Sequence, residues 1–137
     1  MKKKLIIFGN GEIAEIANFY FSQFTNYEIV CFTIDDEFIK ENKFCNKPIV
    51  PFVDIEKNFS PKEYDLHVAI SYQKLNQLRE KKYLEAKNKN YTLASYVSVS
   101  SHINLNKIIF GENCFILENQ TIQNDVKIGN NVMIWSS

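Results

Sequence analysis

A glycine-rich turn is the first feature of the sequence with a recognisable chemistry. Residues 9–14 read Gly-Asn-Gly-Glu-Ile-Ala, which fits the pattern G-x-G-x-x-A between a short apolar run and a segment of helical periodicity. Glycines in this position let backbone N–H groups approach a diphosphate at the positive end of a helix. A tight turn without a ligand has the same pattern. The ligand-binding residues predicted from this turn are Gly9, Asn10, Gly11, Glu12 and Ile13.

Polar residues also follow two later segments with the apolar pattern of a strand, Glu28–Ile34 and Asp65–Ser71. Asp35 and Asp36 come at the end of Glu28–Ile34, about where an acidic residue of a dinucleotide-binding fold meets a ribose, although acids also suit an exposed turn or a helix cap. Open α/β sheets hold their ligands at the carboxyl ends of the strands. A guanidinium there can bind phosphate, although an arginine on a lysine-rich helix is more often only solvated. The candidate ligand-binding residues at and beyond the end of the strand-like segment Asp65–Ser71 are Ser71, Tyr72, Asn76 and Arg79.

Groups for catalysis or metal binding are scarce. His67 falls inside a buried-strand pattern and His102 lies near the start of the C-terminal segment, and we expect a structural role for both. The three cysteines are widely spaced and lack a C-x-x-C pair. This spacing disfavours a disulfide framework and a zinc site, and indicates reduced thiols. We therefore predict no metal site, and we assign a catalytic role to neither histidine.

The composition limits the classes of partner. Sixteen Lys and Arg balance sixteen Asp and Glu, so no broad attraction to nucleic acid or to an anionic membrane is expected. A hydrophobic fraction of 45% with 14% aromatic residues is typical of a folded protein. The apolar run near the N-terminus is too short for a signal-peptide core or a membrane span. We predict a cytoplasmic protein whose partner is a small molecule or another chain.

The elements that must position these residues alternate between strand and helix. Strands are expected at Leu5–Phe8, Glu28–Ile34, Asp65–Ser71 and Tyr91–Val97. The helix after the glycine-rich turn is expected to bury Ile13, Ile16, Ala17, Tyr20 and Phe24, and a second helix is expected throughout 72–89. Alternation of this kind implies parallel pairing. We predict a small doubly wound α/β domain over residues 1–97.

From about residue 98 the sequence has a period of six residues. Positions 110, 116, 122, 128 and 134 are Phe, Ile, Ile, Ile and Ile, and each of the four complete hexads that start at 110, 116, 122 and 128 has Asn at its third or fourth place. Asn tolerates a left-handed backbone, so it suits a tight corner after a very short strand, while the apolar residue points inward. Six residues a side and three sides a coil predict a triangular parallel β-helix over residues 98–137.

Four stretches, in order FGNGEIAE, FTIDDE, VAISYQKLNQLR and IGNNVMIW, resemble a known family. It is the hexapeptide-repeat nucleotide-sugar acyltransferases, in their sialic-acid O-acetyltransferase-like and bacillosamine N-acetyltransferase-like branch. The resemblance implies a small Rossmann-like parallel sheet domain followed by the first coils of a left-handed parallel β-helix. It also implies a nucleotide-sugar substrate, acetyl-CoA or another acyl-CoA as donor, a homotrimer, and a place in bacterial surface-glycan synthesis.

The resemblance extends to particular residues. It implies that Asp35 and Asp36 lie beside the nucleoside of the sugar nucleotide, and Asn76 and Arg79 match the family's N-x-x-R pattern. The family often has glycine where this chain has Ser71 or Tyr72. The family's catalytic base is a histidine in a His-rich stretch beyond the hexads seen here, and neither histidine of this chain matches it.

Residues 110–137 supply about one and a half coils, since one coil takes about eighteen residues. We therefore expect a C-terminally truncated form of a longer acyltransferase, which binds the nucleotide sugar but lacks the catalytic histidine. Two other functions stay open. One is a non-catalytic nucleotide- or dinucleotide-binding module, which has no use for a β-helix tail. The other is an oligomerising scaffold, which would give no signal on titration with sugar nucleotides.

Overall fold

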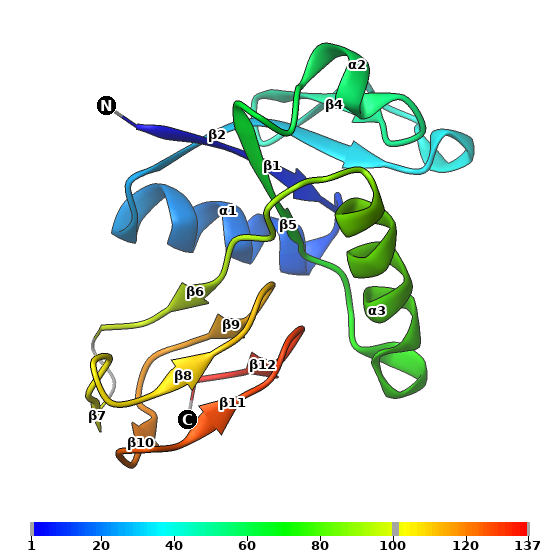
Figure 1. Cartoon of the computed structure of the whole chain (residues 1–137). Helices are drawn as coiled ribbons and strands as arrows, with labels where there is room; N and C mark the ends of the chain where they lie inside the picture. Colours follow the sequence, from blue (N-terminus) through cyan, green and yellow to red (C-terminus); the bar gives the residue numbers. More distant parts are fainter. Residues whose placement is uncertain (1, 100–101, 137) are drawn as a thin grey trace. The chain divides into compact units, whose positions relative to one another are not determined.

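The computed structural model describes residues 2–99 and 102–136, which form two compact units (Figure 1). We call Met1–Leu93 the sheet unit and Ala94–Ser137 the coil unit. The sheet unit contains β1 (Lys3–Phe8), α1 (Glu12–Phe24), β2 (Tyr27–Ile34), the 3₁₀ turn η1 (Asp36–Phe38), β3 (Lys43–Phe44), β4 (Lys47–Pro51), α2 (Ile55–Asn58), β5 (Tyr64–Val68) and α3 (Gln73–Asn88). The coil unit contains β6 (Tyr96–Val97), β7 (His102–Ile103), β8 (Ile109–Phe110), β9 (Phe115–Ile116), β10 (Thr121–Ile122), β11 (Lys127–Ile128) and β12 (Met133–Ile134).

The sheet unit is built on a five-stranded sheet of order β3-β4-β2-β1-β5. β1 pairs in parallel with β2 on one side and with β5 on the other, and β2 pairs in parallel with β4. The prediction of parallel pairing is confirmed for β1, β2 and β5. β4 was not among the expected strands, and the short β3 runs antiparallel to it. The chain builds outward from β1 through β2 and then returns to the opposite side of β1. In open α/β sheets such a reversal marks the place where ligands bind.

The two long helices pack on opposite faces of this sheet. Successive side chains of a strand point to opposite faces. Leu66 and Val68 of β5 share a core cluster with Tyr83 and Ala86 of α3. His67, between them in sequence, faces the other way, and its ring centroid lies 4.8 Å from that of Phe21 in α1. α3 therefore covers one face and α1 the other.

The buried stripe of α1 differs from the expected one. Ala14, Ala17 and Phe21 are fully buried, whereas Phe24, expected in the core, is 60% exposed. The buried positions 14, 17 and 21 recur at helical spacing, so the packed face of α1 consists of two alanines and Phe21. Only Ala17 of the expected face is fully buried.

Two further expectations were wrong in part. Right-handed helix does not run throughout 72–89, because Lys74, Leu75 and Asn76 have left-handed backbone angles, with φ of 54°, 55° and 71°. Each such residue costs about 1–2 kcal/mol relative to a right-handed one. The strand expected at Tyr91–Val97 is divided: Leu93 forms an isolated bridge with Leu66, and β6 belongs to the coil unit.

The strands of the coil unit recur at intervals of six residues from β8 to β12. They stack into three parallel sheets, β12-β9-β6, β10-β7 and β11-β8, so the chain returns to the same sheet at every third strand. β9 lies between β6 and β12, and Phe115 and Ile116 within it are fully buried. Phe110, expected to point inward, is 37% exposed, because β8 has a neighbour on one side only.

Asparagine or aspartate forms the corners of the coil unit. The left-handed residues there are Asn113, Asn119, Asp125 and Asn131, each at the fourth place of its hexad. The prediction of left-handed Asn corners is confirmed at three of these positions. The side chain of Asn113 is fully buried, and its Nδ2 donates to Oδ1 of Asn131, 18 residues later, at 2.8 Å. This bond ties two successive turns of the chain together.

Asn113→Ala is expected to destabilise the coil unit by about 2–3 kcal/mol, because it strains a left-handed corner and leaves the buried Asn131 amide without this partner. Asn119→Ala is the matched control, since Asn119 has φ of 68° but is exposed, and we expect a cost of about 1 kcal/mol. The chain's one tryptophan, Trp135, has its ring 6.5 Å from that of Phe115, so its fluorescence during urea unfolding reports on this unit. Equal costs for the two variants would contradict a stabilising role for the buried amide pair.

Candidate functional site

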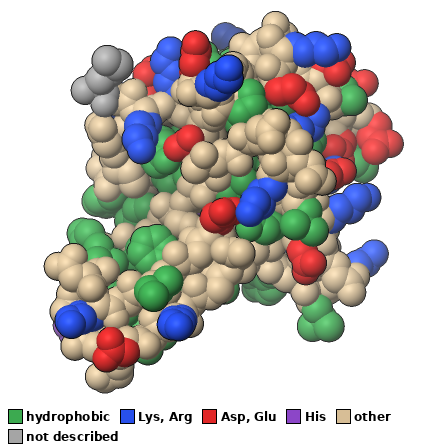
Figure 2. Space-filling view, viewed as in Figure 1, with side chains coloured by type: hydrophobic (Ala, Val, Ile, Leu, Met, Phe, Trp, Pro, Cys, Tyr) green, Lys and Arg blue, Asp and Glu red, His purple; other side chains and the backbone are tan. Residues whose placement is uncertain are grey.

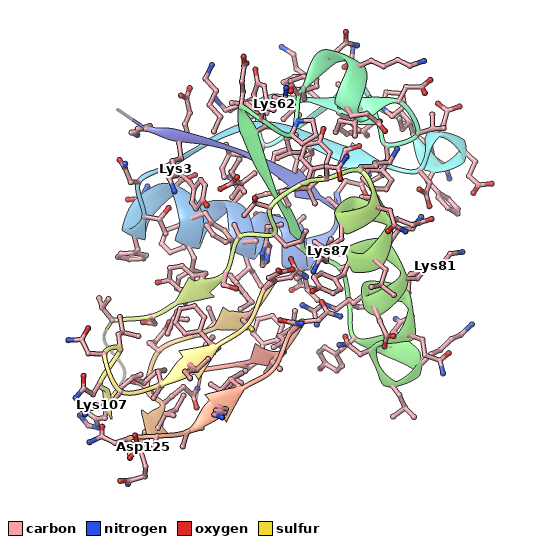
Figure 3. The ribbon with its side chains drawn as sticks, viewed as in Figure 1. Lys3, Lys62, Lys81, Lys87, Lys107 and Asp125 are labelled. Carbon is pink, nitrogen blue, oxygen red and sulfur yellow. The ribbon has the colours of Figure 1, made fainter. Side chains whose placement is uncertain are left out.

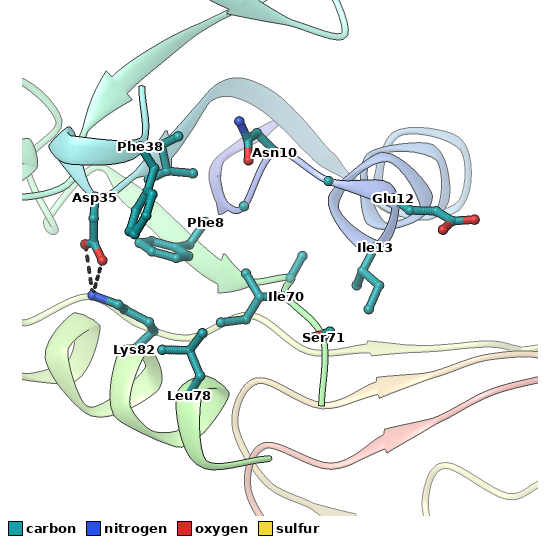
Figure 4. A pocket seen from close by; sticks show the side chains of 14 residues that line it. Phe8, Asn10, Glu12, Ile13, Asp35, Phe38, Ile70, Ser71, Leu78 and Lys82 are labelled. Carbon is teal, nitrogen blue, oxygen red and sulfur yellow. Dashed lines mark hydrogen bonds and ion pairs between the residues drawn. The ribbon is translucent and has the colours of Figure 1, made fainter. Parts of the chain in front are cut away.

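A pocket of about 540 Å³ opens in the sheet unit at the carboxyl ends of β1, β2 and β5 (Figure 4). Its lining comes from the glycine-rich turn, the end of β2 with η1, the segment 69–71 after β5, and two residues of α3. The volume is within the range of about 300–1,000 Å³ found for sites that take small molecules. The pocket therefore lies where the strand order of the sheet reverses, and it is large enough for a small-molecule ligand.

The two glycines of the turn have different structural roles. Gly9 has φ of +131°, its N–H donates to the Thr33 carbonyl at 2.9 Å, and a Cβ on it would lie 2.4 Å from the Ala69 carbonyl oxygen. Gly9 is thus held between the ends of β2 and β5, and packing alone requires glycine there. A Cβ on Gly11 would meet nothing within 4 Å. Gly11 therefore borders open space, which a ligand can use.

The start of α1 supplies hydrogen-bond donors to this space. Gly11 is the N-cap residue, no side chain caps the helix there, and the first helical bond runs from the Glu15 N–H to the Gly11 carbonyl at 3.1 Å. The N–H groups ahead of that bond have no acceptor within the helix, and the helix dipole makes this end positive. The carboxylate of Glu12 extends away from the other labelled side chains in Figure 4. The arrangement favours a ligand with acceptor oxygens, such as a phosphate or a carbonyl.

An ion pair forms the side of the pocket opposite the turn. Lys82 of α3 places its Nζ 2.8 Å from Oδ1 and 2.7 Å from Oδ2 of Asp35, and 2.9 Å from Oε2 of Glu85. Figure 4 shows Asp35 and Lys82 joined at the edge of the cavity. The side chain of Asp35 keeps 30% of its surface exposed, and each carboxylate oxygen can accept more than one hydrogen bond. Asp35 can therefore bind Lys82 and a ligand hydroxyl at the same time.

Lys82 is a buried charge with unusual surroundings. It is 6% exposed, and its Nζ lies 5.5 Å from the ring centroid of Phe8 and 5.8 Å from that of Phe52. Burial lowers the pKa of Lys82, but hydrogen bonding to Asp35 and Glu85 outweighs burial and leaves the pKa raised. The lysine therefore stays charged and fixes the position of Asp35 at the pocket.

The structure brings together seven of the eleven residues proposed from the sequence. The lining of this pocket includes Gly9, Asn10, Gly11, Glu12, Ile13, Asp35 and Ser71. Asp36 lines a neighbouring hollow that shares Asp35 and Lys82 with it. Tyr72 is 57% exposed, and Arg79 is fully buried with its Nη1 donating to Oδ1 of Asn76 at 3.0 Å. Tyr72, Asn76 and Arg79 lie outside the lining of the pocket, so their role in ligand binding stays a prediction.

Sequence reasoning missed the other seven lining residues: Phe8, Ile34, Phe38, Ala69, Ile70, Leu78 and Lys82. Phe38 follows Asp35 by one turn of 3₁₀ helix, so the paired acids could have directed attention to it. Lys82 lies 47 residues from Asp35 in sequence on a lysine-rich helix, and only the three-dimensional structure reveals that it is buried.

Neither histidine of the chain lines this pocket. His67 is 1% exposed beneath α1, and His102 is exposed in β7. No group of three or more His, Cys, Asp or Glu side chains within the described ranges 2–99 and 102–136 could hold a metal ion. None of the helices described has the length and apolar character needed to cross a membrane. Figure 2 shows acidic and basic side chains interspersed over the visible face, as the balanced charge leads one to expect.

Comparison with protein-family models gives no match, and comparison with curated proteins gives none either. Solved structures do match. PerB from Caulobacter crescentus, in complex with CoA and GDP-perosamine, aligns with a TM-score of 0.79 and 19% identity over 97% of this chain and 60% of that chain. The acetyltransferase domain of PglB from Neisseria gonorrhoeae aligns with a TM-score of 0.78 and 19% identity over 96% of this chain and 62% of that chain.

The same PglB domain in complex with acetyl coenzyme A aligns with a TM-score of 0.70 and 16% identity over 97% of this chain and 67% of that chain. The present chain spans about 60% of the length of PerB. At these identities the comparisons establish the architecture. The chain shares the mixed α/β fold, with its parallel sheets, of these acetyltransferase structures.

Proposed function

We propose that this chain is the nucleotide-sugar-binding part of an acetyl-CoA-dependent sugar acetyltransferase. In this proposal residues 1–97 are a Rossmann-like domain that holds the nucleotide-linked sugar. Residues 98–137 are coils of a left-handed β-helix of the hexapeptide-repeat class. The sugar nucleotide occupies the pocket at the carboxyl ends of β1, β2 and β5. A trimeric assembly, a cytoplasmic location and a role in bacterial surface-glycan synthesis belong to the same proposal.

The observation that carries the proposal is the joint presence of two features in one chain. Both units align, in order, with structures whose ligands are CoA, GDP-perosamine or acetyl coenzyme A. The sheet unit also has a ligand-sized pocket where its strand order reverses, with helix N–H donors at one side and a carboxylate at the other. A sugar nucleotide offers phosphate oxygens to the donors and ribose hydroxyls to the carboxylate.

The chemistry of acetyl transfer places two demands on the complete site. The amine or hydroxyl of the sugar attacks the thioester carbonyl, gives up its proton to a base, and releases the CoA thiol. Donor groups must stabilise the negative charge that develops on the carbonyl oxygen. We assign neither role to a residue of this chain, and we propose that its own side chains bind and orient the sugar nucleotide.

Thermal unfolding tests the proposal directly. A GDP- or UDP-linked sugar at 100 times its Kd is expected to add about 2.7 kcal/mol to the free energy of unfolding of the bound state. For a protein of this size that corresponds to a rise in Tm of about 10 °C. Acetyl-CoA alone is expected to leave the Tm unchanged.

Two controls separate this function from its alternatives. NAD⁺ at the same concentration tests the dinucleotide-binding module, and mannose without a nucleotide tests recognition of the sugar alone. Stabilisation by NAD⁺ but not by sugar nucleotides would contradict the proposal. So would a flat response to every sugar nucleotide, which a purely oligomerising scaffold would give.

A further inference from the structure

The rim of the pocket carries large apolar side chains that are exposed to solvent. Phe38 of η1 is 61% exposed and Leu78 of α3 is 51% exposed, and both line the cavity. In Figure 4 these two side chains come from different elements, with the ring of Phe8 near that of Phe38. Exposed apolar groups gathered at a concave site are a common mark of ligand binding.

Exposed aromatic rings elsewhere in the sheet unit have a different setting. Phe19 and Phe24 of α1 are 54% and 60% exposed, but they lie edge-on to each other with ring centroids 5.9 Å apart. Tyr20 lies beside both, with centroids 5.3 Å from Phe19 and 5.9 Å from Phe24. These rings cover part of one another, whereas Phe38 presents its surface at the pocket.

The backbone links Phe38 to the carboxylate of the site. The Phe38 N–H donates to the Asp35 carbonyl at 3.0 Å, so one closed turn carries both residues. Lys82 holds the Asp35 side chain from the other side through both carboxylate oxygens. The position of the ring relative to the carboxylate is therefore set by a short turn that is fixed at its start.

We infer that Phe38 is a specificity-determining residue that forms an aromatic wall against which the nucleobase of the ligand stacks. The inference rests on the proposed function, which supplies a ligand that has a flat base and a ribose. A ribose that hydrogen-bonds to Asp35 places its base within reach of the same turn. Every nucleobase has a flat π-face, so it can stack on an aromatic ring whichever base it is. The wall therefore favours nucleotide-linked sugars over free sugars and sugar phosphates, and accepts either purine or pyrimidine.

Substitutions at residue 38 of the full chain test the wall by calorimetric titration with GDP-mannose and UDP-N-acetylglucosamine. Phe38→Ala is expected to raise the Kd for both ligands about tenfold, and Phe38→Tyr to keep it within about threefold, since base–ring stacking survives only in the second. Phe19→Ala is the control, because it removes an equally exposed ring from α1 and is expected to leave both Kd values unchanged. The melting temperature of each variant shows that it is folded.

Fluorescence supplies a readout that a purely structural role would not change. The wild type has one tryptophan, Trp135, and Phe38→Trp adds a second one at the aromatic wall. We expect sugar nucleotides to quench the emission of this added indole. Binding of wild type and Phe38→Ala with the same Kd, together with no quenching in Phe38→Trp, would overturn the aromatic wall and leave the proposed function intact. No binding to the wild type would overturn both.

Discussion

Gly9→Ala is expected to destabilise the sheet unit by roughly 4 kcal/mol, because the new Cβ meets backbone that cannot move aside and the residue is held at a strained φ. The Cβ would lie 2.4 Å from the Ala69 carbonyl oxygen at φ of +131°, and β5 would have to separate from β1 to admit it. A loss of this size is a large part of the 5–15 kcal/mol that stabilises an ordinary domain. The measurement is the urea midpoint followed by far-ultraviolet circular dichroism.

Gly11→Ala is the matched substitution in the same turn, and it separates folding from binding. A Cβ on Gly11 meets no atom of the chain within 4 Å, so the free energy of unfolding is expected to change by less than about 1 kcal/mol. If a sugar nucleotide approaches this backbone, the added methyl group occupies its space and raises the Kd at least tenfold, an effect of about the size known for one misplaced methyl group in a pocket. Normal binding by a folded Gly11→Ala variant would exclude close approach of the ligand to this turn.

The glycine-rich turn was predictable because its signal is local. A buried strand, two glycines and a helical pattern follow one another within 24 residues, and each constrains the backbone of the next. The sequence pattern could not distinguish the two glycines. One is required by a carbonyl of Ala69, which is remote in sequence, and the other borders empty space.

The corners of the coil unit were predictable for a similar reason. Asn113, Asn119 and Asn131 are left-handed because an amide side chain lowers the cost of that backbone, and the spacing of six repeats the cue. Lys74 and Leu75 offer the opposite case. Both are good helix formers, yet they are left-handed at the start of α3, and nothing in their local sequence indicates it.

The electrostatic part of the site was hidden for a third reason. Lys82 stands in a run of charged residues on α3, and such residues are usually solvated. Figure 3 shows its neighbour Lys81 extending outward from the helix, as that expectation requires. Only the contact with Asp35, far away in sequence, together with the rings of Phe8 and Phe52, makes Lys82 a buried residue. An ion pair between α3 and the end of β2 is a tertiary contact, so no local pattern predicts it.

Removing the acids around Lys82 is expected to cost more stability than removing Lys82 itself. The double variant Asp35→Asn/Glu85→Gln leaves a buried ammonium group without either carboxylate, and breaking a buried pair in this way costs about 3–5 kcal/mol. Lys82→Met leaves Asp35 and Glu85 behind, but their side chains are 30% and 39% exposed and can turn to water. The methionine fills the same space beside Phe8 and Phe52, and we expect a cost of about 1 kcal/mol.

The pH dependence identifies the cause of the larger loss. In the double variant, burial acts on Lys82 without the two carboxylates that raise its pKa, so the folded-state pKa falls below the unfolded one. The unfolded state then binds more protons, and the free energy of unfolding rises as pH increases from 7 toward 10. Lys81→Met is the control, because Lys81 is exposed on the same helix and should change stability by less than about 0.5 kcal/mol. Two results would contradict this account: a larger loss of stability in Lys82→Met than in the double variant, or no gain in stability of the double variant with rising pH. Either result would mean that the two acids do not hold the ammonium group in place and that the η1 turn alone positions Asp35.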